Sequence, residues 1–179
     1  MSTTVVAVSG NPRPGSRTLR VARTLAGALA ERLDAGAVTS LDLAEVAPQL
    51  FAEEAPDADR FADVLAGAAV AVVATPVYKA SYTGLLKAFL DRYPTGGLRG
   101  VLAVPVVVSA SPAHSFVAEH LLRPLLVELG ASAPTRPFAV TEARLDDLDA
   151  LAAAWADEAA GVVAALLTAQ PARPAGEAA

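Results

Sequence analysis

The fold is decided by the stretch Val5-Val6-Ala7-Val8-Ser9-Gly10-Asn11-Pro12-Arg13-Pro14-Gly15-Ser16-Arg17-Thr18. Its first part is a continuous apolar run, which predicts a strand covered on both faces. The run breaks into a loop rich in Gly and Pro, and a helical pattern follows at once. A strand that passes through such a loop into a helix forms an anion site, because free backbone N–H groups and the helix dipole face the loop.

Polar side chains strengthen the prediction of an anion site in this loop. Ser9, Ser16 and Thr18 supply hydroxyls, and Arg13 and Arg17 supply guanidinium groups whose fork suits phosphate. The alternative is an ordinary turn with a serine N-cap. The loop is neither a Walker A motif, since Ser16-Arg17 replaces Lys-Ser/Thr, nor a G-x-G-x-x-G fingerprint. A single terminal phosphate, such as that of a mononucleotide, fits it best.

Length and composition indicate one folded domain. The chain has 179 residues, 54% of them hydrophobic, a mean hydropathy of +0.43 and a net charge of -5. The negative charge argues against nucleic-acid binding. With no Cys and two His, we expect no disulfide and no metal site. The apolar run 100–110 is too short to span a membrane and no signal peptide is evident, so we expect a cytoplasmic protein.

Strand and helix patterns alternate five times along the chain. The apolar strands and the alternation favour a parallel sheet, in the order 2-1-3-4-5, with helices on both faces. Either Asp57 or Asp59 is expected to cap the second helix. We expect one domain over residues 1–168 and a flexible, Pro/Ala-rich tail over 169–179. The expected strands are 4–9, 37–43, 70–75, 101–109 and 137–141, and the expected helices are 16–33, 57–68, 81–91, 115–129 and 145–167.

Two further loops follow the third and fourth strands. Pro76 stiffens one strand exit and Tyr78 offers an aromatic wall to a flat ligand. The alternative is a proline that only ends the strand and a tyrosine packed on the surface. The other loop, 109–114, ends in His114, which lies either near a ligand or in solvent. Because ligands of such sheets bind at the carboxyl ends of the strands, we expect the three loops to converge on one site.

The pattern resembles the NADPH-dependent FMN reductases of the flavodoxin-like fold, in particular the sulfonate-linked two-component reductases. The resemblance rests on 9–13 with 16–18, on the run Thr75-Pro76-Val77-Tyr78-Lys79-Ala80-Ser81-Tyr82-Thr83-Gly84-Leu85-Leu86-Lys87, and on 113–114 with 122–126. It implies a three-layer α/β sandwich and an enzyme that passes hydride from NADPH to FMN. The family usually has a Gly-Gly pair where this chain has Ser109-Ala110, so less room is expected there.

The resemblance also implies which residues bind FMN. The residues implied for the phosphate are Ser9, Arg13, Ser16, Arg17 and Thr18. Those implied for the isoalloxazine ring are Pro76, Val77, Tyr78 and Lys79, and those implied for its pyrimidine edge are Ser109, Ala110, Ser111 and His114.

The family leaves the fate of the flavin open. FMN released as FMNH2 would supply a flavin-dependent monooxygenase. Retained FMN would reduce quinones, azo compounds or metal oxyanions. A flavodoxin-type electron carrier is a third possibility, which Arg13, Arg17 and the aliphatic Val77 argue against.

The fourth predicted helix contains Pro124, which cannot donate a hydrogen bond to the carbonyl of His120. We therefore expect a kink or a π-bulge at His120. In the resembling family this place is an inserted residue at a subunit interface, usually Tyr and sometimes His. The alternative is a polar residue on a solvated face. We expect a homo-oligomer, most simply a tetramer, with His120 influencing flavin retention.

Overall fold

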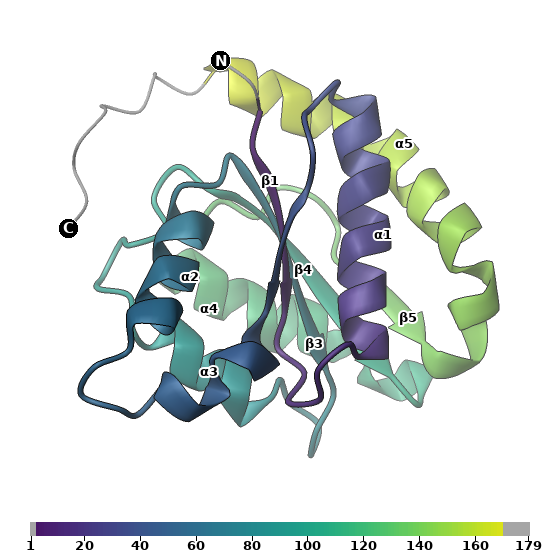
Figure 1. Cartoon of the computed structure of the whole chain (residues 1–179). Coiled ribbons are helices and arrows are strands. Elements are labelled where there is room, and N and C mark those ends of the chain that lie inside the picture. Colours follow the sequence, from purple (N-terminus) through teal and green to yellow (C-terminus); the bar gives the residue numbers. More distant parts are fainter. Residues whose placement is uncertain (1–2, 170–179) are drawn as a thin grey trace.

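The computed structural model describes residues 3–169. Its centre is a five-stranded parallel sheet in the order β2-β1-β3-β4-β5, which confirms the predicted topology (Figure 1). The carboxyl ends of β1, β3 and β4 are neighbours along one edge of the sheet, the lower edge in Figure 1. The strands are β1 (Val5–Ser9), β2 (Thr39–Asp42), β3 (Val70–Pro76), β4 (Leu102–Ser109) and β5 (Phe138–Thr141).

Helices cover both faces of the sheet and complete the flavodoxin-like three-layer sandwich (Figure 1). Val5 and Ala7 of β1 pack in the core cluster of α1 and α5, whereas Val6 and Val8 pack in the cluster on the opposite face. Because successive strand side chains point to opposite faces, burial on both sides requires the continuous apolar run seen in the sequence. One face carries α1 (Arg17–Arg32) and α5 (Leu148–Ala169), and the other α2 (Pro56–Ala66), α3 (Gly84–Leu90) and α4 (Arg123–Glu128).

Several element boundaries differ from those expected. The strand expected over 37–43 is only Thr39–Asp42, and two short 3-10 helices, Leu43–Glu45 and Ala47–Gln49, follow it. The prediction of an aspartate cap on α2 was wrong. Ala55 is the N-cap residue, and the side chain of Gln49 accepts hydrogen bonds from the N–H groups of Asp57 and Ala58 instead. A side chain from another segment thus replaces the local cap.

The helices after β3 and β4 also differ. α3 begins three residues later than expected, with Thr83 as its N-cap. The helix expected over 115–129 is a π-helix, Ala118–Leu122, that continues into α4. The last helix starts after a 3-10 helix, Glu142–Asp147, and runs to Ala169, so residue 169 belongs to this helix and not to a tail. The rest of that tail, residues 170–179, lies outside the described residues.

The α5 helix is more apolar than sequence analysis recognised. The stretch Glu142–Ala169 is long and apolar enough to cross a membrane by length and composition, a test that core helices of soluble proteins also pass. Its inner face packs on α1 and the sheet, where Trp155 is fully buried. The indole Nε1 donates to the Arg136 carbonyl at 3.2 Å, so the one polar atom of this ring has a partner.

Candidate functional site

The start of α1 is open to an anion. Ser16 is its N-cap residue, with its Oγ accepting from the N–H of Leu19 at 3.2 Å. The N–H groups of Ser16, Arg17 and Thr18 have no acceptor among residues 3–169. Three consecutive free donors at the positive end of a 16-residue helix form the arrangement that binds phosphate. This part of the loop has the geometry that the sequence predicts.

Other donors of the same loop are already occupied. The Arg13 N–H donates to Asn11 Oδ1 at 3.0 Å, and Asn11 Nδ2 donates to Thr18 Oγ1 at 3.1 Å. The Gly15 N–H donates to Oδ2 of Asp42, the last residue of β2, at 2.9 Å. Sequence analysis did not single out Asn11 or Asp42. The sequence could have indicated the role of Asn11, because an asparagine side chain often accepts a hydrogen bond from the backbone N–H two residues later. The Asp42 contact joins distant segments and has no such local signal.

The predicted phosphate residues occupy two layers. Ser9 and Thr18 are buried, and Ser9 Oγ lies 3.4 Å from Ser16 Oγ. The hydroxyls of Ser9 and Thr18 therefore support the loop from its buried side. Arg17 forms an ion pair with Glu142 at 2.9 Å. Arg13 is exposed, and its guanidinium has no partner among the described residues. Arg13 is therefore the loop cation most available to a ligand.

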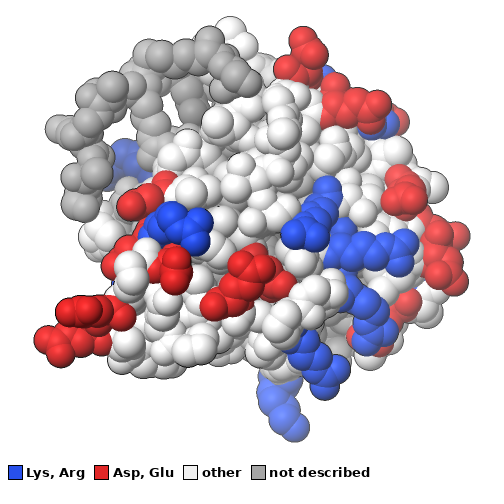
Figure 2. Space-filling model, in the orientation of Figure 1, with Lys and Arg blue, Asp and Glu red and all other residues white. Residues whose placement is uncertain are grey.

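Positive charge gathers around this edge although the chain is acidic overall. Figure 2 shows Lys and Arg side chains over the lower half of α1 and the lower edge of the sheet, with Asp and Glu mostly elsewhere on that face. A phosphate or dinucleotide approaching the carboxyl edge therefore meets a locally positive field.

The second loop is a tight hairpin. Pro76 ends β3, and the next N–H, that of Val77, donates to the Val108 carbonyl at 3.1 Å. Tyr78 and Ser81 exchange backbone hydrogen bonds of 2.9 and 3.1 Å. Between them, Lys79 and Ala80 have φ values of 52° and 58°, which makes a type I′ turn without glycine. The hairpin displays Tyr78, which is 44% exposed, with Lys79 at its tip.

The first and second loops are joined by Thr83. Its Oγ1 donates to the Gly10 carbonyl and accepts from the Leu86 N–H, and its own N–H donates to Thr75 Oγ1. A Cβ at Gly10 would stand 2.7 Å from the Leu86 Cβ, so only glycine lets α3 approach the first loop this closely. The structure thus brings the first two predicted loops together as one unit.

The third loop continues the same edge. Ser109 Oγ donates to the Ser111 carbonyl at 2.8 Å, and Ser111 Oγ accepts from the Ala113 N–H at 3.3 Å. His114 ends a 3-10 helix, Pro112–His114, and is partly exposed, while Ala110 is exposed. Neither Ser109 nor Ala110 has a positive φ, so this loop forms without the conformational freedom of a glycine pair.

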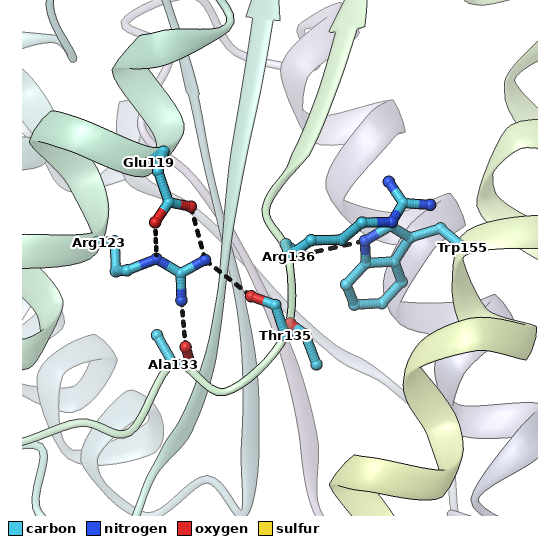
Figure 3. A network of polar contacts seen from close by, with 6 residues as sticks. All are labelled: Glu119, Arg123, Ala133, Thr135, Arg136 and Trp155. Carbon is cyan, nitrogen blue, oxygen red and sulfur yellow. Dashed lines mark hydrogen bonds and ion pairs between the residues drawn. The ribbon is translucent and has the colours of Figure 1, made fainter.

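The π-helix confirms the predicted distortion at His120. The Arg123 N–H donates to the Ala118 carbonyl, five residues back, and the His120 side chain is exposed. Arg123 forms a bidentate pair with Glu119 and also donates to the carbonyls of Ala133 and Thr135 (Figure 3). These bonds fasten the distorted turn to the segment that leads into β5. The hydrogen bond from Arg123 lowers the pKa of Glu119.

Fold and site together define a flavodoxin-like α/β protein with a phosphate-type loop and two more loops at one sheet edge. The chain belongs to the NADPH-dependent FMN reductase family, which it matches over residues 3–144. It is therefore an oxidoreductase that uses FMN and a reduced nicotinamide nucleotide. This confirms the resemblance stated from the sequence.

Curated relatives agree on the reaction and differ in the nucleotide. The chain is 34% identical over 133 residues to an FMN reductase (NADPH) of Escherichia coli K12, covering 71% of this chain and 67% of that one. It is also 34% identical over 126 residues to the NADH-dependent FMN reductase SfnF of Pseudomonas putida, covering 68% of each. Similarity to relatives of both kinds supports NAD(P)H as the donor.

Solved structures support the fold. The apo form of an NADH:FMN oxidoreductase, EMOB, superposes with a TM-score of 0.79 at 28% identity, covering 97% of this chain and 92% of the other. An oxidoreductase from Corynebacterium diphtheriae gives 0.78 at 28% identity, covering 96% and 100%. A WrbA-like flavodoxin from Agrobacterium tumefaciens, at 18% identity and a TM-score of 0.59, shows the fold alone over 96% and 100%.

Proposed function

We propose that the FMN phosphate binds at the start of α1 and that the isoalloxazine ring lies between the second and third loops. The observation that carries this proposal is the row of three free N–H groups at Ser16, Arg17 and Thr18, beside the unpaired guanidinium of Arg13. In this seat Arg13, Ser16 and Arg17 contact the phosphate, and the hydroxyls of Ser9 and Thr18 lie behind it. The ring then meets Pro76, Val77, Tyr78, Lys79, Ser109, Ala110, Ser111 and His114.

Bound FMN supplies the ring that accepts hydride; the protein's task is to position it. Hydride transfer requires the nicotinamide to stack on the ring, and no general base has to act. The rigid hairpin of Tyr78–Ser81 fixes one side of the ring site. The ammonium of Lys79, which has no partner among residues 3–169, stabilises negative charge that develops on the reduced ring.

We further propose NADPH as the hydride donor and FMN as an exchangeable substrate whose reduced form supplies a flavin-dependent monooxygenase. Arg20, on the exposed face of α1 one turn beyond Arg17, supports a nucleotide with an additional phosphate. Among residues 3–169 its guanidinium donates only to the Leu145 carbonyl. His120 supports exchange, because an imidazole stacks less area on a flavin than the tyrosine usual at this place in the family.

The test compares wild type with His120→Tyr and with the control His120→Ala. We expect wild type to purify with little flavin and to oxidise NADPH, faster than NADH, only when FMN is added. His120→Tyr should raise flavin occupancy and slow transfer to a diffusing acceptor, while His120→Ala changes release little. If wild type purifies fully loaded and His120→Tyr behaves the same, a reductase with retained FMN replaces this proposal.

We also propose a cytoplasmic homotetramer. Apolar side chains at the surface of two helices support association: Val127 on α4 is 51% exposed and Val162 on α5 is 48% exposed. The π-helix that carries His120 leads directly into α4, so an interface there would bring a second copy close to that residue.

A further inference from the structure

We propose that Asp42 is a positioning residue that sets FMN affinity from behind the phosphate loop. Its carboxylate holds the loop through Gly15, and its charge opposes that of the phosphate, which keeps FMN exchangeable. Asp42 is 4% exposed and accepts from the Gly15 N–H through Oδ2. The other oxygen, Oδ1, is buried without a hydrogen-bond partner among the described residues. The inference rests on the proposed phosphate seat.

The topology places this carboxylate beside the loop. Asp42 is the β2 partner of Ser9 in the parallel register, so it stands one strand away from the residue where the loop begins. Gly15 immediately precedes the N-cap residue Ser16 and has a φ of +63°. A Cβ at Gly15 would have nothing within 4 Å, and the Gly15 N–H donates to Asp42.

No cation neutralises Asp42 among residues 3–169. The arginines of the loop and of the adjacent face of α1 have other contacts or none. Arg17 pairs with Glu142, Arg20 donates to the Leu145 carbonyl, and Arg23 donates to Ser40 Oγ. Arg13 makes no side-chain contact. A buried acid without a paired charge is costly for folding, which indicates that its position serves the loop.

The consequence is a loop that is ordered but not optimal for an anion. In a loop that binds phosphate more tightly, the Gly15 N–H would face the ligand. Here it donates to Asp42 instead. The negative charge of the Asp42 carboxylate also remains close to a dianionic phosphate, and repulsion between charges inside a protein is poorly screened. Both effects weaken FMN binding without disordering the loop. An enzyme that releases its reduced flavin after each turnover benefits from this balance.

The test separates the hydrogen bond from the charge. Asp42→Asn keeps an oxygen acceptor for the Gly15 N–H and removes the charge, Asp42→Ser is a second neutral variant, and Asp42→Ala removes both acceptor and charge. Glu45→Gln, an exposed acid three residues further on, is the control for net charge. The dissociation constants of FMN and of riboflavin, which lacks the phosphate, are measured by fluorescence titration of each apo-protein, with thermal unfolding as the check of folding.

We expect Asp42→Asn to bind FMN about ten-fold more tightly than wild type and riboflavin equally well. Asp42→Ser should shift in the same direction, Asp42→Ala should bind FMN more weakly than Asp42→Asn, and Glu45→Gln should match wild type. Unchanged or weaker FMN binding in both neutral variants would overturn the proposal, as would equal changes for FMN and riboflavin. Arg13→Ala separates failure of the Asp42 proposal from failure of the proposed phosphate seat. If Arg13→Ala also leaves FMN affinity unchanged, the proposed phosphate seat is wrong.

Discussion

At the scale of single residues, we expect binding at the proposed phosphate seat to depend most on the side chain of Arg13. Replacing it by alanine removes one charge-assisted contact, about 1.5–3 kcal/mol, so the dissociation constant of FMN should rise roughly ten- to a hundred-fold. Arg17→Ala should have a smaller effect, because Glu142 already shares that guanidinium. Fluorescence titration of the two apo variants measures both values. Equal affinities in wild type and Arg13→Ala would place the phosphate elsewhere.

Ala80 carries backbone strain at the same scale. A side chain at φ 58° costs about 1–2 kcal/mol relative to the ordinary helical region, and glycine does not have this cost. Ala80→Gly should therefore raise the stability of the apo-protein by roughly 1 kcal/mol in a urea titration. The control is Ala110→Gly, also exposed in a site loop but without a positive φ, which should give no gain. A loss of stability in Ala80→Gly would show that the turn is not strained.

At the scale of elements, the Glu119–Arg123 pair stabilises the turn that contains the π-helix (Figure 3). The pKa of Glu119 is lowered in the folded state, so the pair adds stability above the pKa of an unfolded glutamate, about 4.3, and this contribution is lost as the pH falls through the lower folded value. Glu119→Gln should therefore melt below wild type at neutral pH, with the gap closing in acid. Glu128→Gln, on α4, is the control. A gap that persists at low pH would contradict the linkage.

At the scale of the whole molecule, the exposed apolar side chains predict assembly. We expect the apo-protein to sediment as a tetramer at micromolar concentration, and Val127→Glu on α4 to dissociate it, because a buried unpaired carboxylate is unfavourable at an interface. Val162→Glu on α5 tests the other helix face. Wild type that sediments as a monomer would contradict the prediction.

Local chemistry explains why much of the fold was predictable. The Val-rich runs show burial on both faces of the strands, and alternation with helices leaves few topologies besides a parallel sandwich. Pro124 removes one donor from the turn that contains His120, so the distortion there follows from covalent structure. Ser16 marked the start of α1, because an N-cap depends on backbone geometry within a few residues.

Contacts between distant segments were decided only by the tertiary structure. The bonds of Asp42 to Gly15 and of Glu142 to Arg17 span 27 and 125 residues, and no local pattern marks them. The late start of α3 has a similar origin, since the Lys79–Ala80 turn lacks the glycine or asparagine that such turns usually contain and is held by its surroundings. The sequence alone thus determined the sheet, the loop and the family resemblance. Packing decided which donors of the loop have partners and which remain free.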